Sequence, residues 1–424
     1  MPVVTKSPPV SPFPRLAVTR LSHSTIEWYR SRGVEWLRKN ATVTWEQPSQ
    51  AFQIFGLGTA ARLVGRRGEG FREARRTLER TIAHFDAETS PAPPPLVFAA
   101  SAFDPSGRKI DTAWDAFGGW QVLVPAITLL RRGNEWTGWA CAGDFPLEDH
   151  AAQIAPEPET PSDDLGASIA SAVAEIQTGH YQKVVLAASR IIETGAMTPA
   201  EVLARLARAF PTCTIFSIRS GGLTWLGASP EPLAESRGGN VSLVSLAGSR
   251  RRGRDSAEDA LLERELLASE KERWEHRLVV EAITAEAQGL VNDLRVPAEP
   301  AIMKLANIQH LCTPIHGRLA PGRSLLDLVE RLHPTPAVGG WPRAAALSAI
   351  RRLEGIDRGW YAGPVGWVDT AGDGQFVVGL RTALLGQGFA RLYAGAGIVA
   401  DSHPSAELDE IETKLDALRG VIAQ

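Results

Sequence analysis

The spacing of apolar and polar residues changes along the chain and predicts a strand-rich first part. Between residues 26 and 64, short apolar pieces alternate with tryptophans and polar residues, which predicts strands joined by loops. Residues 69–86 have helical spacing, and the apolar runs 96–103 and 120–130 predict further strands. Residues 129–136 carry a hairpin signal, a Gly-Asn pair between apolar flanks. We find no catalytic constellation in this part.

The second part has a more regular pattern of helices and strands. A Pro-Ser-Asp-Asp sequence at residues 161–164 predicts the cap of a helix that ends near Gly179. A single long helix is expected over residues 257–288. The predicted strands of this part cover residues 181–190, 214–218, 223–228, 241–246, 361–368, 376–385 and 390–394.

The end of the chain predicts a buried strand, a glycine turn at residues 395–397 and a helix. On that helix Glu407, Glu410 and Lys414 share one face, because they are three and seven residues apart. The neighbouring face carries an apolar stripe that would dock the helix on the core, formed by Leu408, Ile411, Leu415 and Leu418. Two carboxylates and an ammonium beside a glycine turn suit a divalent cation and an anionic ligand. A solvated face with a Glu–Lys pair is the alternative.

Composition narrows the possible functions. The chain has 424 residues and a net charge of −3, without a long Lys/Arg block, which argues against nucleic-acid binding. Its three cysteines are far apart and lack ligand spacing, which argues against zinc and a disulfide scaffold. No apolar run reaches the roughly 18 residues of a membrane span. Residues 1–25 read as a flexible tail, and a cytoplasmic location is expected.

One stretch of the chain has the composition of a linker, but it is too weak a signal to divide the chain into independent domains. Residues 144–164 are acidic and rich in proline, yet the strands on both sides read as parts of one fold. We predict a single α+β unit over residues 26–424, with an N-terminal lobe at 26–150 and a catalytic lobe at 162–424.

Several ionisable residues stand at positions suited to chemistry. Glu275 lies at the apolar boundary of the long predicted helix, and with Glu410 it would form a hydrated magnesium site. Lys183 begins an apolar strand, where burial would make it a usable base. Glu231 follows Ser-Pro at a strand end and would be a general acid if an apolar wall kept it protonated. The alternatives to these catalytic roles are a lysine whose aliphatic part is buried while its ammonium group reaches solvent, and glutamates that are simply solvated.

Other residues suit the binding of carboxylates. The backbone at Gly248, Ser249 and Gly397 allows close approach of an anion, and Arg381 offers a bidentate fork. The hydroxyl of Tyr361 would reach the same anion. His333 reads as a turn histidine without a second His in ligand spacing. The whole set describes a small di-acid substrate handled by acid–base chemistry with magnesium.

These stretches together resemble the chorismate-utilising enzymes of menaquinone, siderophore and tryptophan synthesis, and among them the isochorismate synthases. The similarity covers residues 162–424 in ordered blocks, whereas residues 26–150 match loosely. The blocks are Lys183-Val-Val-Leu, Ser229-Pro-Glu231, Leu246-Ala-Gly-Ser249 with Ala268–His276, and His333-Pro-Thr-Pro-Ala-Val-Gly-Gly through Gly395-Ala-Gly-Ile to Glu410-Ile-Glu-Thr-Lys414.

The resemblance implies two large antiparallel sheets packed together, helices outside, and an active site in the cleft, as in anthranilate synthase component I. It implies Mg²⁺ as cofactor and chorismate as substrate. Lys183 would activate water for attack at C2, Glu231 would protonate the leaving C4 hydroxyl, and His333 would line the pocket. Glu275 and Glu410 would hold the metal, with Glu407 acting through water. The substrate-binding set would be Ala247, Gly248, Ser249, Tyr361, Arg381, Gly397 and Lys414.

Relatives with other activities leave alternatives open. Salicylate synthases share the base and the acid and also eliminate pyruvate, so they are the main alternative. Aminodeoxychorismate synthases typically carry a lysine where this chain has Ala247, and anthranilate synthases typically lack the lysine at position 183. No glutaminase partner is expected, and monomers are common among single-chain relatives. A non-catalytic chorismate-binding protein would be expected to lack Lys183 or Glu231.

Overall fold

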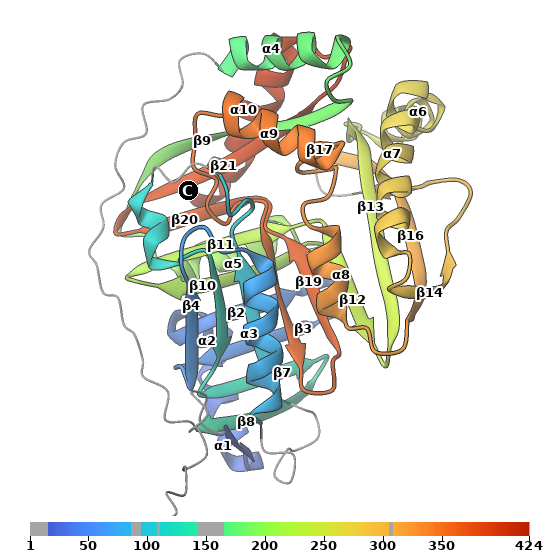
Figure 1. Ribbon diagram of the computed structural model, residues 1–424. Coiled ribbons are helices and arrows are strands. Elements are labelled where there is room, and N and C mark those ends of the chain that lie inside the picture. The colour runs from blue at the N-terminus through green and yellow to red at the C-terminus, as the bar shows by residue number, and fades with distance from the viewer. Residues whose placement is uncertain (1–15, 86–94, 108–110, 143–164, 305–307, 424) are drawn as a thin grey trace, which may run out of the picture.

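The computed structural model describes residues 16–85, 95–107, 111–142, 165–304 and 308–423. Two antiparallel sheets form its centre and helices lie around them (Figure 1). The predicted α+β class with two large sheets is therefore confirmed. Among the helices of these ranges, none is long and apolar enough to cross a membrane.

The first sheet combines strands from both halves of the chain, because β2 pairs with β10. Its order is β1 (Ala17–Arg20), β8 (Glu135–Ala142), β7 (Ile127–Arg132), β3 (Phe52–Leu57), β2 (Ala41–Gln47), β10 (Thr214–Ser220), β11 (Leu223–Ser229), β20 (Thr382–Gly386), β21 (Gly388–Ile398), β9 (Lys183–Gly195) and β17 (Gly340–Trp341).

The second sheet is shared in the same way, since β5 pairs with β18. Its order is β14 (Val291–Arg295), β16 (Ile308–Leu319), β13 (Asn240–Arg251), β12 (Pro232–Arg237), β19 (Gly374–Val378), β18 (Pro364–Asp369), β5 (Leu96–Ser101), β6 (Trp120–Val124) and β4 (Ala61–Gly65), with β15 (Ala301–Lys304) beside β16. The division into two lobes stays a prediction.

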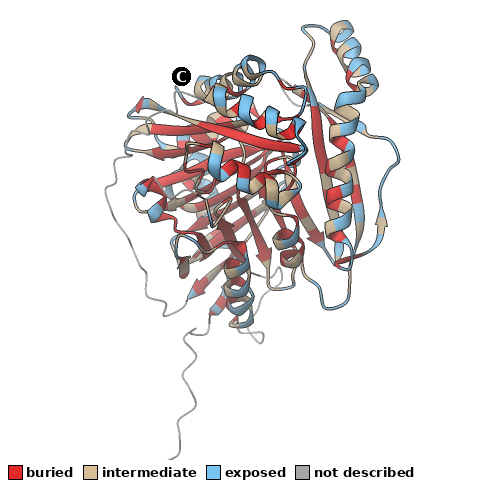
Figure 2. Cartoon of the chain, turned by 45° about the horizontal axis from the view of Figure 1, so that its top comes forward, coloured by how far each residue is buried: buried red, intermediate tan, exposed pale blue. Residues whose placement is uncertain are grey.

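The two sheets pack through their inner faces. The rings of Phe52 on β3 and Trp367 on β18 stack at 6.1 Å between centroids. Gln47 Nε2 on β2 donates a hydrogen bond to Gln375 Oε1 on β19 at 3.0 Å. Figure 2 shows the consequence, because the central strands are almost entirely buried while the helices keep exposed faces. Strands buried on both faces explain the near-continuous apolar runs of the sequence.

The helices occupy the outside of the sheets. Among them, α10 packs on β21 and α7 packs on β13, and these contacts bring two charged helix faces to the site described below. The helices are α1 (His23–Ser31), α2 (Gly33–Asn40), α3 (Phe71–Ala83), α4 (Leu165–Gln177), α5 (Pro199–Ala209), α6 (Ser256–Ala268), α7 (Glu270–Ala287), α8 (Leu325–Leu332), α9 (Arg343–Leu353) and α10 (Pro404–Ile422).

Several sequence predictions about elements are wrong. Residues 26–40 form most of two helices rather than strands, and their aromatic residues pack among themselves, as Trp28 and Trp36 show. The predicted tail overlaps β1, which pairs with β8. The single long helix is two helices, because the Ser269 hydroxyl caps α7 by accepting from the N–H of Glu272.

The C-terminal region also differs from its prediction in detail. Gly395 and Gly397 lie inside β21 rather than in a turn, and β21 pairs with β9 as far as Ile398. The predicted strand at 376–385 is interrupted at Arg381, which has a φ of +50° and separates β19 from β20. The predicted apolar stripe of α10 is confirmed, since Ile411, Leu415 and Leu418 are buried.

Candidate active site

A cavity of about 390 Å³ opens where the two sheets meet helices α7 and α10. Its volume lies in the range of small-molecule sites. The structure brings most of the predicted site residues to its wall, namely Lys183, Glu231, Ala247, Gly248, Ser249, Glu275, Tyr361, Arg381, Gly397, Glu410 and Lys414.

Two predicted site residues lie outside this lining. The His333 ring is half-buried, its Nε2 atom bonds the carbonyl of Phe103 at 2.9 Å, and the residue does not line the cavity. Burial lowers the pKa of His333 to about 4, which keeps the ring neutral. The following loop contributes Ala337 and Val338 to the wall instead. Glu407 lies one helical turn from Glu410 and also does not line the cavity.

Lys183 is almost fully buried at the start of β9. Its Nζ atom lies 2.5 Å from Oε1 of Glu275, which α7 presents from the other side of the cavity. Burial pushes the pKa of Glu275 upward, but the charge and hydrogen bond of Lys183 outweigh burial and leave it lowered. The lysine and the glutamate thus form a buried ion pair at the cavity wall.

Glu231 has the environment expected of a general acid. It follows β11, and its own N–H donates to the Ser229 hydroxyl at 3.2 Å, which holds the turn. Burial raises the pKa of Glu231 to about 7, although Lys183 and a 3.3 Å hydrogen bond from Thr335 oppose the shift. A carboxyl group with this pKa is available to donate a proton near neutral pH.

Two further cations, Arg381 and Lys414, line the cavity. The Arg381 guanidinium stacks on the Phe210 ring at 4.7 Å and contacts Cys213, while Lys414 Nζ donates to the Gly395 carbonyl at 2.9 Å. Burial, with a smaller contribution from these two charges, lowers the pKa of His310 to about 4. Two cations and a neutral imidazole suit the binding of carboxylates.

The glycines of β21 keep this cavity open. A Cβ atom at Gly397 would lie 3.0 Å from Cε of Lys183, so a side chain there would push the lysine aside. A Cβ atom at Gly395 would lie 3.2 Å from the Tyr361 hydroxyl. A Cβ atom at Gly395 would also lie 3.0 Å from the carbonyl oxygen of Leu186, so both positions are tight because of nearby atoms and not because of a positive φ.

The carboxylates that would hold a metal come from two helices, α7 and α10. Among the described residues, no three His, Cys, Asp or Glu side chains lie close enough to hold a metal ion. Glu275 and Glu410 nevertheless line the same cavity, and each has an ammonium partner, Lys183 and Lys414 respectively. Two carboxylates with room for water and a substrate carboxylate fit the open site that Mg²⁺ prefers.

Glu272 was not predicted from the sequence. It lies three residues before Glu275 on α7, and Glu407 and Glu410 have the same spacing on α10. Glu272 Oε2 accepts the N–H of Ser249 at 2.9 Å, at the backbone position expected to bind a substrate carboxylate. Burial and the neighbouring Glu275 raise the pKa of Glu272, and burial also raises that of Glu407. The equal spacing of the two pairs was the available signal.

His310 was also missed, because the strand that carries it was not predicted. In the structure β16 pairs with β13, and this register places His310 opposite Ser249. Its Nδ1 atom lies 2.7 Å from the Ser249 hydroxyl. The Ser249 hydroxyl therefore contacts His310, while the Ser249 backbone N–H donates to Glu272.

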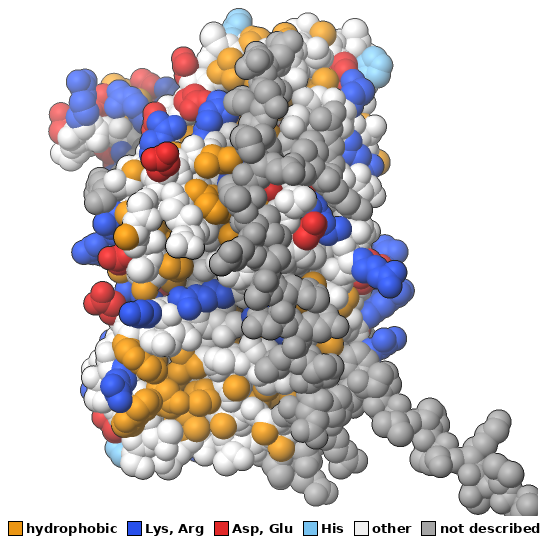
Figure 3. All heavy atoms as spheres, turned by 90° about the vertical axis from the view of Figure 1, so that its left-hand side faces the viewer, with side chains coloured by type: hydrophobic (Ala, Val, Ile, Leu, Met, Phe, Trp, Pro, Cys, Tyr) orange, Lys and Arg blue, Asp and Glu red, His pale blue; other side chains and the backbone are white. Residues whose placement is uncertain are grey.

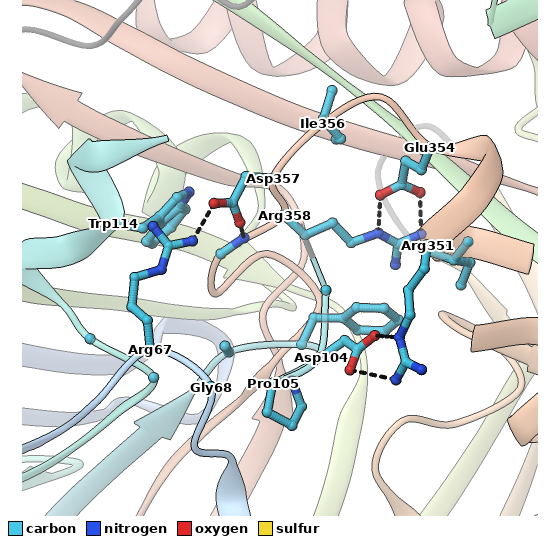
Figure 4. Close-up of a pocket in the computed structure, with 17 residues that line it drawn as sticks. Arg67, Gly68, Asp104, Pro105, Trp114, Arg351, Glu354, Ile356, Asp357 and Arg358 are labelled. Atoms are coloured by element: carbon cyan, nitrogen blue, oxygen red, sulfur yellow. Dashed lines mark hydrogen bonds and ion pairs between the residues drawn. The ribbon is translucent and has the colours of Figure 1, made fainter. Parts of the chain in front are cut away.

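Behind the cavity, a buried ion pair supports the strand that carries Lys183. Figure 4 shows Arg358 and Glu354 joined by two hydrogen bonds in a small pocket. Arg358 also donates to the carbonyl of Val185 at 2.8 Å, and Glu354 accepts the N–H of Ala187 at 2.9 Å. The pair therefore fixes β9 just beyond Lys183.

The fold has two packed antiparallel sheets, and its cavity brings together a buried amine, a buried carboxyl group and two further cations. The chain belongs to the family described as chorismate binding enzymes, whose model matches residues 24–143 and 140–423. The family expected from the sequence is therefore confirmed.

Individual relatives agree with this assignment. The chain is 37% identical over 412 residues to the Salicylate biosynthesis isochorismate synthase of Pseudomonas aeruginosa, covering 91% of this chain and 86% of that protein. It is 35% identical over 404 residues to the isochorismate synthase MenF of Bacillus subtilis, covering 88% and 85%.

Solved structures show the same fold. The menaquinone-specific isochorismate synthase MenF of Escherichia coli matches with a TM-score of 0.77 and 25% identity, over 98% of this chain and 96% of that one. Anthranilate synthase component I of Streptococcus pneumoniae matches with a TM-score of 0.70 over 87% and 92%, and at 19% identity it supports the fold alone.

Proposed function

We propose that this chain is an isochorismate synthase, which adds water at C2 of chorismate and removes the C4 hydroxyl. The observation that carries the proposal is the placement of Lys183 and Glu231 in one cavity that the cations Arg381 and Lys414 also line. An amine and a protonated carboxyl group supply the base and the acid that this isomerisation needs. The isochorismate synthases among the relatives support the same reaction.

In the proposed mechanism, Lys183 takes a proton from the attacking water while Glu231 gives its proton to the leaving C4 oxygen. The C2–O bond forms, the ring double bonds shift, and the C4–O bond breaks with release of water. Because base and acid are separate residues on β9 and after β11, the two steps take place at different ring positions. Arg381 and Tyr361 would hold the enolpyruvyl carboxylate beside the backbone of Gly397.

The metal proposed for this site is Mg²⁺, held by Glu275 and Glu410 with Glu407 and Glu272 in support. When bound, Mg²⁺ would anchor the ring carboxylate of the substrate. It would also bind the carboxylate of Glu275, which pairs with Lys183 in this structure. The ring carboxylate would lie between the metal position, Lys414 and the backbone of Ala247, Gly248 and Ser249. The amine that would take the proton from water is therefore the group that contacts Glu275 in this structure.

Product analysis tests this function. Purified protein is incubated with chorismate and Mg²⁺, with and without EDTA, and the products are separated by chromatography. Isochorismate that forms only without EDTA is the expected result. Salicylate with pyruvate would show a salicylate synthase, and no metal-dependent product would show a protein that only binds chorismate.

A further inference from the structure

The carboxyl group of Glu231, the proposed general acid, has a specific side-chain partner. Lys, Arg, Asp and Glu side chains are spread over the face of the molecule seen in Figure 3, where solvent reaches them. Glu231 is buried instead. Within the described chain, the side chain that bonds its carboxyl group is Thr335, whose Oγ1 atom donates to Oε1 at 3.3 Å. The other oxygen, Oε2, accepts no hydrogen bond from the described residues.

The backbone that carries the Thr335 hydroxyl is held firmly. Prolines precede and follow this residue, and each restricts its own φ angle. The carbonyl of Thr335 accepts from the N–H groups of Val338 at 3.2 Å and Gly339 at 2.9 Å. Thr335 is itself buried and does not line the cavity, so it can act on a substrate only through Glu231.

The same segment also holds the strand that carries Lys183. The N–H of Val185 donates to the carbonyl of Gly339 at 3.1 Å. β17 follows directly, and its Trp341 pairs with Lys183 in the first sheet. Residues 335–341 therefore contact the proposed acid at one end and the strand of the proposed base at the other. The relative placement of acid and base, on which the reaction depends, rests on this short segment.

Two ionisable side chains interact electrostatically with Glu231, namely Lys183 and Tyr361. Burial favours the protonated form of Glu231, while the hydrogen bond from Thr335 and the charge of Lys183 favour the carboxylate. Tyr361 stays neutral, because burial raises its pKa. Removal of the Thr335 hydroxyl would therefore leave burial less opposed and raise the pKa of Glu231 further.

We propose that Thr335 is a positioning residue that holds Oε1 of Glu231 and leaves Oε2 to protonate the C4 oxygen of the substrate. This role rests on the proposed isochorismate synthase reaction. The proton moves from Oε2 to the C4 oxygen, and the C4–O bond breaks with release of water. The carboxylate that remains keeps the hydrogen bond from Thr335, which favours the charged form. Because χ1 of threonine is restricted, the donor fixes one orientation of the carboxyl group.

Steady-state kinetics with chorismate as a function of pH test this role. Thr335→Val removes the hydroxyl and keeps a branched side chain. We expect kcat to fall about tenfold, and the alkaline decline of kcat/KM to move to higher pH than in the parent. Thr335→Ser retains the donor and should restore both quantities toward those of the parent. A residue that only stabilises the fold would not move the pH profile.

A second measurement needs no turnover. Infrared difference titration of the full chain, with Glu231→Gln as the reference, follows the band of the protonated carboxyl group. Its midpoint should rise in Thr335→Val and return in Thr335→Ser. Because these midpoints are measured without substrate, they separate a failure of this role from a failure of the proposed function. An unshifted midpoint in Thr335→Val would overturn the role while the function stands.

Thr44→Val is the matched control, because it also removes a buried threonine hydroxyl, which shares a 2.8 Å hydrogen bond with Ser217 on the adjacent strand. Thr44 does not line the cavity, so this variant should lose stability without a change in the pH profile. The proposal is overturned if Thr335→Val keeps the kcat and pH profile of the parent. It is equally overturned if Thr335→Ser is impaired as strongly as Thr335→Val, or if Thr44→Val shifts the profile as much.

Discussion

Lys183 Nζ and Glu275 Oε1 lie 2.5 Å apart, and this contact joins the proposed base to a proposed metal ligand. Both side chains are largely withdrawn from solvent, and they come from a strand of the first sheet and a helix that packs on the second. A cation that binds Glu275 therefore competes directly with the lysine. This relationship connects metal binding to the contact that holds the proposed base.

Lys183→Ala should lower kcat by about 100-fold or more, because the attacking water loses its base. Chorismate binding should change little, since the cations Arg381 and Lys414 in the same cavity are retained. Steady-state kinetics and calorimetry with chorismate measure the two effects. Turnover that survives in this variant would remove Lys183 as the base.

Gly397→Ala should reduce kcat about tenfold or more with the fold intact. The new methyl group would lie 3.0 Å from Cε of Lys183 and 3.4 Å from its Nζ, and small displacements of a catalytic group are costly. Gly420→Ala on α10 is the control, because a Cβ atom there meets no atom within 4 Å. Equal activity of the two variants would contradict the close approach.

Glu231→Gln should abolish turnover and raise stability at alkaline pH. Burial raises the pKa of Glu231 from 4.5 to about 7, so the folded protein binds this proton more tightly than the unfolded chain. The contribution of the group to stability therefore falls as pH rises from about 4.5 to about 7, by about 3 kcal/mol in total.

Denaturant unfolding at pH 5 and pH 8 measures this effect. The variant should gain stability relative to the parent only at the higher pH. In the parent enzyme kcat/KM should decline above about pH 7, where the acid loses its proton. A variant with the same pH dependence of stability as the parent would show that Glu231 is not the buried acid.

Glu410→Gln should weaken Mg²⁺ binding about tenfold or more and weaken chorismate binding with it, because the ring carboxylate is expected on the metal. Calorimetric titration with Mg²⁺ and the Mg²⁺ dependence of the rate measure this. Glu412→Gln on the same helix is the control, since Glu412 pairs with Arg190 and does not line the cavity. Unchanged Mg²⁺ dependence in Glu410→Gln would refute the assignment.

Glu354→Gln should destabilise the protein by about 3 kcal/mol, because it leaves the buried charge of Arg358 without its carboxylate. Arg352→Ala breaks an exposed pair with Glu175 and should cost less than about 1 kcal/mol. Urea unfolding of both variants measures the difference. Similar losses would mean that the buried pair does not support β9.

Local patterns allowed much of this fold and site to be predicted. Helix periodicity placed Glu407, Glu410 and Lys414 on one helix, and the apolar run after Lys183 indicated its strand. These predictions succeeded because each depends on neighbours within a turn or a strand. The two-sheet architecture required the resemblance to a family, since strand order depends on partners far apart in the chain.

What could not be predicted depends on long-range pairing. The contact of Lys183 with Glu275 joins residues 92 positions apart. His310 reaches the site only through the register of β16 on β13. His333 was placed at the reacting ring, whereas its side chain bonds the carbonyl of Phe103, and side-chain direction in a turn has no sequence signal.

The most direct test of the proposed chemistry is the origin of the new oxygen. Wild-type enzyme converts chorismate in H₂¹⁸O, and mass spectrometry of the isochorismate counts the labelled oxygen. Because the amine and the acid are separate groups, we expect one ¹⁸O at the C2 hydroxyl of each product molecule. Isochorismate without label would mean that the original hydroxyl migrates, and would contradict water activation by Lys183.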